Sequence, residues 1–249
     1  MPPDPPFARP RRDGTAADRR GGRDTVTGFY GRYADLYDRI ATLPVVRRWR
    51  RRAAAALALD PGDTVVEVGC GTGANVSYLR ERVGPGGRVV GVDLTGPLLR
   101  RTRRRARLAG WENAAVVRGD ATRPPVERAD AVLASFVVGL LADPGDAVRT
   151  WCDLVGSSGR VAVLDGAPSD HPVGRLLNPA FGAFVGAGAP APTLSASARQ
   201  ALAGAVGAGP RASLARKVTD ARRALTDRTT DRRFETFGLG VIGLLSGRV

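Results

Sequence analysis

The chain has 249 residues, of which 43% are hydrophobic and 25% are charged, and its formal net charge is +14. This length and composition predict one sizeable globular α/β domain with extensions, and they exclude a chain that is disordered throughout. We expect no membrane-spanning helix, because no run of about 20 apolar residues occurs, and no signal peptide, because no apolar core follows the N-terminal arginines. Two cysteines make no disulfide framework and fit a reducing, cytoplasmic environment.

The positive charge comes almost entirely from arginine, because Lys217 is the only lysine in the sequence. Such a charge favours an anionic partner, either nucleic acid or the head groups of an anionic membrane. A general enrichment in arginine, without any binding role, explains the charge equally well. The sequence therefore predicts a cytoplasmic protein and leaves peripheral contact with a membrane open.

Residues 1–25 are rich in Pro, Arg, Asp and Gly and lack apolar periodicity, so we predict a disordered basic tail. Residues 26–249 are expected to form the domain. Near its start, Tyr30, Tyr33 and Tyr37 share one face of a predicted helix. These rings either pack the helix onto the domain or form an aromatic lid over a cationic ligand.

The chain is organised around residues 65–73, which read Val-Val-Glu-Val-Gly-Cys-Gly-Thr-Gly. The β-branched start predicts a buried strand, the alternating glycines predict a turn, and a helical pattern resumes at Ala74. This arrangement brings bare backbone to a nucleoside-containing ligand at the mouth of a parallel sheet. The spacing fits a dinucleotide-binding turn, but Glu67 favours a ligand that carries an amine, because a pyrophosphate would be repelled.

The rest of the chain alternates strands and helices. Further strands are predicted over 88–93, 114–118, 129–136 and 160–165, with closing strands within 234–248. Helices are predicted over 43–59, 74–83, 98–108, 143–154 and 213–225, with a weaker one over 195–208.

The segment Glu67 to Gly73 resembles the first motif, E/D-x-G-x-G-x-G, of class I S-adenosylmethionine-dependent methyltransferases and matches it in full. The aromatic opening that ends in Tyr37-Asp38 is similar to that of the quinone-biosynthesis and phosphatidylethanolamine methyltransferase group. This resemblance implies an α/β fold with a doubly wound, seven-stranded, mostly parallel sheet of the Rossmann-like kind. It implies S-adenosyl-L-methionine as the cofactor and no metal.

The resemblance also assigns the cofactor-binding residues. An acid at the position of Asp93 accepts hydrogen bonds from ribose hydroxyls in dehydrogenases and methyltransferases alike. Asp120 would meet the adenine amine, which favours a methyltransferase over an NAD-dependent oxidoreductase. The full expected set is Glu67, Gly69, Cys70, Gly71, Gly73, Asp93, Leu94, Asp120, Ala121, Ser135, Tyr37 and Tyr30.

The acceptor is less well defined by the sequence. The stretch Ser135-Phe136-Val137-Val138 lacks the Asn/Asp-Pro-Pro-aromatic motif of base-amine methyltransferases, and no Pro-Cys nucleophile is present. Nucleic acid is therefore disfavoured, and the apolar run fits a small-molecule or lipid-like acceptor covered by residues 166–210. His171 and Asp165 are the candidates for a general base. An RNA or protein methyltransferase that uses the arginine-rich surface, and an NAD-dependent oxidoreductase, are the alternatives.

Overall fold

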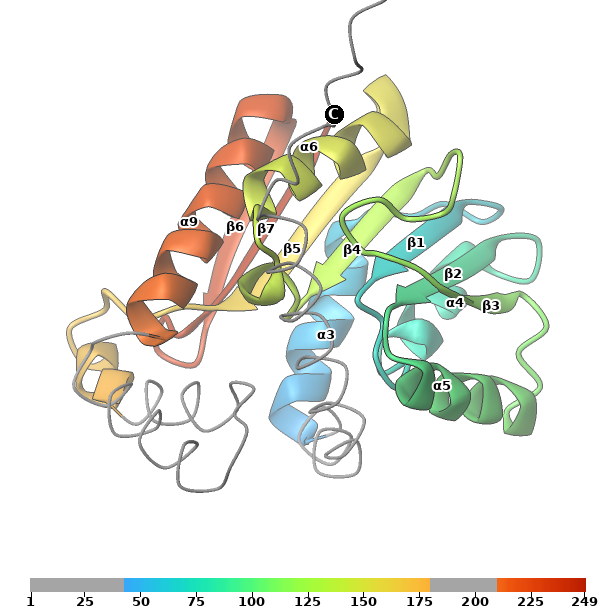
Figure 1. The fold of residues 1–249 in the computed structure, drawn as a ribbon, viewed down its shortest axis with the longest axis horizontal. Helices are drawn as coiled ribbons and strands as arrows, with labels where there is room; N and C mark the ends of the chain where they lie inside the picture. Colours follow the sequence, from blue (N-terminus) through green and yellow to red (C-terminus); the bar gives the residue numbers. More distant parts are fainter. Residues whose placement is uncertain (1–42, 180–209) are drawn as a thin grey trace, which may run out of the picture.

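The structure is a computed structural model that describes residues 43–179 and 210–249. These residues build a seven-stranded sheet in the order β3-β2-β1-β4-β5-β7-β6 (Figure 1). The strands are β1 (Thr64–Val68), β2 (Arg88–Asp93), β3 (Ala114–Arg118), β4 (Ala131–Ser135), β5 (Arg160–Gly166), β6 (Thr230–Phe237) and β7 (Ile242–Arg248). Strands β1 to β5 pair in parallel, and β7 runs antiparallel to both β5 and β6. The expected mostly parallel sheet is confirmed.

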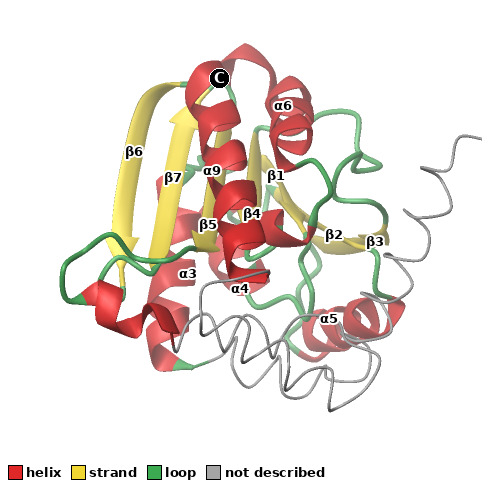
Figure 2. Cartoon of the chain, turned by 60° about the vertical axis from the view of Figure 1, so that its left-hand side comes forward, coloured by secondary structure: helices red, strands yellow, loops and turns green. Residues whose placement is uncertain are grey.

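Helices cover both faces of this sheet. They are α3 (Pro44–Ala56), α4 (Val76–Val83), α5 (Gly96–Leu108), α6 (Pro144–Val155) and α9 (Pro210–Arg228), with short 3₁₀ turns η1 (Val138–Leu140), η2 (Gly156–Ser158) and η3 (Gly174–Leu177). Figure 2 shows α6 and α9 in front of the strands and α3 and α4 behind them. The expectation of a doubly wound sheet is therefore also confirmed.

The two layers form because successive residues of a strand point to opposite faces. In β1, Val66 packs in the same core as Trp151 of α6. Its neighbour Val65 packs instead with Leu57 and Leu79, in the core that α3 and α4 cover. All five of these side chains are fully buried, so β1 is apolar on both faces, as its valine-rich sequence indicates.

One connection departs from a regular alternation of strands and helices. Between β3 and β4 the described chain has no helix. Two consecutive prolines, Pro124 and Pro125, lie in this connection, and proline disfavours a helix interior. Pro125 instead packs closely over Gly119 at the end of β3, where an added Cβ would lie 2.6 Å from the proline ring.

The predicted helix at 213–225 runs three residues further at each end, and the predicted closing strands are β6 and β7, joined by a turn that contains Gly238 and Gly240. The basic tail over 1–25 and the weaker helix over 195–208 lie outside the described residues. Within the described parts of the chain, no helix has the length and apolar character needed to cross a membrane.

Candidate functional site

The glycine turn after β1 adopts a conformation that side chains would block. Gly69, Gly71 and Gly73 have φ of 67°, 54° and 75°, in the left-handed region that favours glycine. A Cβ on Gly69 would lie 2.6 Å from Val137, and a Cβ on Gly73 would lie 2.5 Å from Thr102. The turn therefore needs positions without a side chain at these three glycines. It lies at the edge of the sheet where the parallel strands end, which we call the carboxyl edge.

Asp93 holds this turn in place from the end of the neighbouring strand β2. Its carboxylate accepts hydrogen bonds from the backbone N–H of Gly71 at 2.9 Å and of Thr95 at 2.7 Å. The side chain is partly exposed, and a carboxylate can accept about four hydrogen bonds. Asp93 therefore has capacity left for ligand hydroxyl groups, and Leu94 follows it directly in the chain.

Asp120 and Ala121 lie at the end of β3, the third strand along this edge. One carboxylate oxygen of Asp120 accepts a hydrogen bond from the backbone N–H of Thr122 at 3.0 Å. The Ala121 side chain is buried, and its carbonyl oxygen accepts a hydrogen bond from the indole of Trp151 at 2.7 Å. Three acidic residues thus lie at the adjacent carboxyl ends of β1, β2 and β3. They are Glu67 and Asp93, near the ends of their strands, and Asp120, just after the end of β3.

A buried polar cluster lies beneath the glycine turn, on the side covered by α3 and α4. The side-chain amide nitrogen of Asn75 donates to Glu67 at 2.5 Å and to the Ser135 hydroxyl at 2.8 Å. Arg50, from α3, donates to the same hydroxyl at 3.1 Å and lies over the ring of Phe136. Ser135, predicted to bind the cofactor, therefore joins β4 to the base of the turn.

Arg50 and Asn75 are the two members of this cluster that the sequence analysis missed. Arg50 lies among five arginines on one helix, yet it is the one in phase with the buried residues Val46, Ala53 and Leu57. That helical phase is the signal by which it could have been found. Asn75 has no comparable periodic signal, because it lies in the turn between the glycines and α4.

The Glu67 carboxyl is unusual in its protonation and in its hydrogen bonding. Burial raises its pKa to about 7, an effect that the hydrogen bond from Asn75 and the charge of Arg50 only partly oppose. Its second oxygen, Oε2, is buried and accepts no hydrogen bond from any described residue. A buried acceptor without a donor costs free energy, and a donor on a bound ligand would remove that cost.

The cofactor implied by the resemblance fits these residues. A methionine ammonium group is a donor suited to Glu67, and ribose hydroxyls are donors suited to Asp93. The three glycines of the turn carry no side chain that would keep a ligand away from the backbone N–H groups. These assignments, including those of Leu94, Asp120, Ala121 and Ser135, remain predictions.

Methyltransferases are among the known proteins that this chain resembles. Residues 65–159 match the family described as a methyltransferase domain. Nocamycin O-methyltransferase from Saccharothrix syringae is 33% identical over 141 residues, covering 56% of this chain and 50% of that protein. A demethylmenaquinone methyltransferase from Staphylococcus aureus is 26% identical over 174 residues, covering 68% of this chain and 71% of that protein.

A solved structure shows the same fold. It is a SAM dependent methyltransferase from Aquifex aeolicus, with a TM-score of 0.53 at 16% identity, and the likeness covers 80% of this chain and 88% of that one. The matched segment and the fold are those of class I S-adenosylmethionine-dependent methyltransferases. The likeness to methyltransferases favours this class over an NAD-dependent oxidoreductase, the alternative that the glycine pattern alone had left open.

Cys70 is a packing residue within the glycine turn. Its thiol is buried, and an added Cβ on Gly91 of β2 would lie 2.8 Å from its sulfur. Burial raises the pKa of the thiol well above its ordinary value, and the charges of Glu67 and Asp93 raise it further. The thiol therefore stays protonated and is no nucleophile.

The two candidate bases, Asp165 and His171, both have structural partners. Asp165 is buried at the end of β5 and accepts hydrogen bonds from the backbone N–H of Val138 at 3.2 Å and of Gly166 at 2.9 Å. Burial raises its pKa to about 7. His171 is exposed, and its Nδ1 accepts a hydrogen bond from Gly174 at 3.4 Å. The contacts of Asp165 brace η1 against β5, and a catalytic role for either residue remains a prediction.

Exposed apolar side chains gather along the carboxyl edge of the sheet. They come from the start of α3, from η1 after β4, from the η3 region after β5 and from the β6–β7 turn, and each is between 41% and 79% exposed. We call this set the apolar rim; it consists of Leu43, Val45, Leu140, Val173, Leu176 and Leu239. The aromatic residues Tyr30, Tyr33 and Tyr37, and residues 180–209 of the expected acceptor cover, lie outside the described residues.

Proposed function

We propose that the protein transfers a methyl group from S-adenosylmethionine to a small-molecule or lipid-like apolar acceptor. The apolar rim carries this proposal. Single exposed apolar side chains are ordinary on a protein surface, but a group of them around one opening is typical of a binding site. Here six such side chains from separate segments share the edge at which the glycine turn lies.

The names of the relatives support the same class of acceptor. The matched proteins act, by their names, on nocamycin and on demethylmenaquinone. The chain spans about half the length of the nocamycin enzyme, so these names indicate a substrate class and no specific substrate.

The chemistry needs little from the protein beyond alignment. Bound S-adenosylmethionine supplies the activated methyl group. The chain's part is to hold the cofactor through the glycine turn, Glu67, Asp93 and Asp120, and to orient an acceptor that enters across the apolar rim. Such positioning alone can be worth effective molarities of roughly 10⁵–10⁸ M.

A methyl-transfer assay tests the proposal. Labelled S-adenosylmethionine is incubated with the full chain and with one of three acceptor sets: apolar phenols and quinols, total RNA, or protein. We expect label in the apolar compounds. Label in RNA or protein alone would overturn the proposal and would support the alternative that uses the arginine-rich surface.

The cofactor site is checked separately by calorimetry with S-adenosylhomocysteine. Asp93→Ala removes the carboxylate that we expect to accept the ribose hydroxyls and that also holds the Gly71 N–H. We expect it to abolish measurable binding, whereas Asp227→Ala, at an exposed position on α9, leaves binding intact. Equal affinity in the wild type and Asp93→Ala would contradict the assignment of Asp93.

A further inference from the structure

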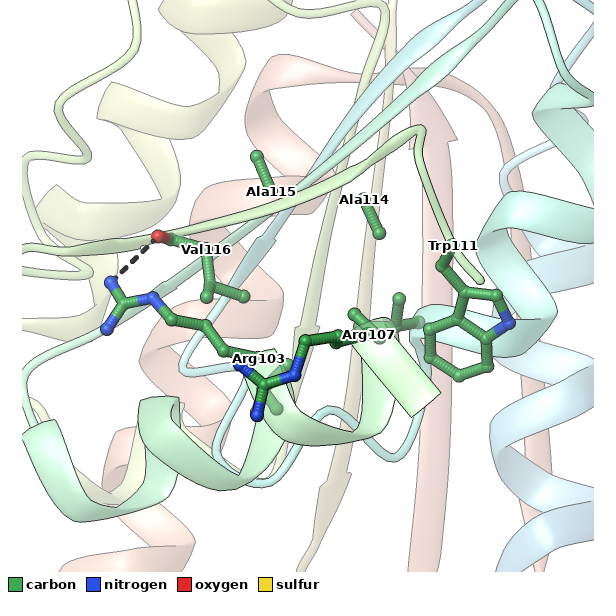
Figure 3. A pocket seen from close by; sticks show the side chains of 9 residues that line it. Arg103, Arg107, Trp111, Ala114, Ala115 and Val116 are labelled. Atoms are coloured by element: carbon green, nitrogen blue, oxygen red, sulfur yellow. Dashed lines mark hydrogen bonds between the residues drawn. The ribbon is translucent and has the colours of Figure 1, made fainter. Parts of the chain in front are cut away.

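A hollow with a volume of about 330 Å³ lies between α5 and β3, apart from the carboxyl edge. Small apolar side chains line its interior, among them Ala106, Ala114 and Val116. Because Ala114 begins β3, whereas Asp120 follows the end of that strand, the hollow lies against the strand's first half. Figure 3 shows that Arg103 and Trp111 stand at its two ends, with Arg107 between them.

The charge around the hollow is entirely positive. None of its lining residues is acidic. Arg103 uses one nitrogen to donate to the carbonyl oxygen of Val116 at 3.1 Å, which leaves most of its five N–H groups available (Figure 3). Arg107 is exposed, and no described residue forms an ion pair or hydrogen bond with its side chain. Two guanidinium groups, four residues apart on one helix, thus face the same opening.

The aromatic end of the hollow is held in a fixed position. Trp111 is partly buried, and the guanidinium of Arg80 lies 5.7 Å from its ring centroid. Arg80 is itself fixed by a hydrogen bond to the side chain of Asn113 at 3.3 Å. A fixed indole beside an apolar floor is a surface on which a flat ring can pack.

We propose that this hollow is a second binding site of the protein, for a flat aromatic acid. The ring system would occupy the apolar floor beside Trp111, and the carboxylate would pair with Arg107 and Arg103. Guanidinium groups bind carboxylates through paired, charge-assisted hydrogen bonds. The volume lies at the lower end of the roughly 300–1,000 Å³ that small-molecule sites occupy, which suits a ligand of two fused rings.

The site is adjacent to the cofactor site but does not overlap it. Thr102 lines the hollow, and its hydroxyl donates to the carbonyl oxygen of Gly71 at 2.8 Å. The cofactor turn therefore lies on the far side of this wall. An aromatic acid and S-adenosylhomocysteine are expected to bind at the same time.

Calorimetry on the full chain, with saturating S-adenosylhomocysteine present, tests the proposal. The probes are 2-naphthoate and its neutral analogue 2-naphthamide. We expect 2-naphthoate to bind at one site and about tenfold more tightly than the amide, because a charge-assisted pair is lost with the amide. Equal affinity of the two probes, or competition between 2-naphthoate and S-adenosylhomocysteine, would overturn the proposal. Binding of S-adenosylhomocysteine itself reports on the proposed function independently.

Three variants locate the site. Arg107→Ala is expected to weaken 2-naphthoate binding about tenfold, while Arg104→Ala, an exposed arginine of the same helix outside the hollow, leaves it unchanged. Ala106→Leu fills the floor without changing charge or helix propensity and is expected to abolish binding of both probes. Unchanged binding in Arg107→Ala and Ala106→Leu, with both variants folded by circular dichroism, would place the acid elsewhere and overturn the proposal.

Discussion

Gly69 shows how a single backbone position controls the cofactor turn. Replacing it with alanine adds a Cβ to a residue at φ 67° and drives that atom to within 2.6 Å of Val137. A left-handed conformation costs an alanine about 1–2 kcal/mol, and overpacking adds about 1–3 kcal/mol. We expect Gly69→Ala to lower the free energy of unfolding by about 3 kcal/mol, measured by urea denaturation, and to remove S-adenosylhomocysteine binding.

Gly62 is a matched control for this substitution. It has φ of 101°, but an added Cβ would meet nothing within 4 Å. Gly62→Ala therefore keeps the backbone strain without the clash, and it should cost about 1–2 kcal/mol and leave binding intact. Equal losses in the two variants would show that Val137 does not limit the turn.

Glu67 makes the free energy of unfolding depend on pH with a sign opposite to that of most carboxylates. Burial raises its folded pKa to about 7, above the unfolded value of 4.5. The folded carboxyl therefore keeps its proton to higher pH, so its stability contribution is complete below pH 4.5 and is lost as pH rises through 7. Glu67→Gln lacks this group, so its free energy of unfolding relative to wild type should rise by about 3 kcal/mol between roughly pH 5 and pH 8.

Denaturation curves at the two pH values measure this difference directly. Asp165 also has a pKa raised to about 7, so the wild type alone does not isolate Glu67. Glu81→Gln, at an exposed position on α4, is the control, because it makes the same chemical change outside the buried cluster. A difference between Glu67→Gln and wild type that is independent of pH would contradict the prediction.

At the scale of a single element, α3 shows that equally charged residues can have unequal roles. Arg50 is 4% exposed and donates to Ser135, whereas Arg48 is exposed on the same helix. Arg50→Ala removes a charge-assisted hydrogen bond to the buried Ser135 hydroxyl and the positive charge beside the buried Glu67 carboxyl, so we expect a loss of about 2 kcal/mol in the free energy of unfolding. Arg48→Ala should change it by less than about 0.5 kcal/mol. Similar losses in the two variants would refute the buried role of Arg50.

The same helix indicates how far the sequence predicts the site. The five arginines at 47–52 read as a solvated face, because charged residues usually lie at the surface. Which of them turns inward depends on the phase of the helix against β4, and the phase is set by the burial of Val46, Ala53 and Ala54. The existence of α3 was therefore predictable, whereas the contact between Arg50 and Ser135 depends on tertiary packing.

Across the whole molecule, we expect the two edges of the sheet to differ in function. Leu176, in the apolar rim, is 79% exposed at the carboxyl edge, and Leu108, at the end of α5, is 73% exposed at the opposite edge. Leu176→Ser should raise KM for an apolar acceptor several-fold, since burial of such a side chain is worth about 1–2 kcal/mol, without changing S-adenosylhomocysteine affinity. Leu108→Ser should change neither quantity. Equal effects of the two substitutions on KM would show that the apolar rim does not contact the acceptor.

The amino-acid sequence was sufficient to predict the layers of the fold, the glycine turn and the cofactor class. Those features follow from local chemistry: β-branched runs form strands, and only glycine tolerates the turn after β1. The buried polar cluster, the apolar rim and the hollow could not be predicted in this way, because each of them joins residues that are distant in the chain. Packing of α3 on β4 brings Arg50 to Ser135, 85 residues away. The parallel pairing of strands collects the apolar rim at one edge, and the fit of α5 against β3 creates the hollow beside Trp111.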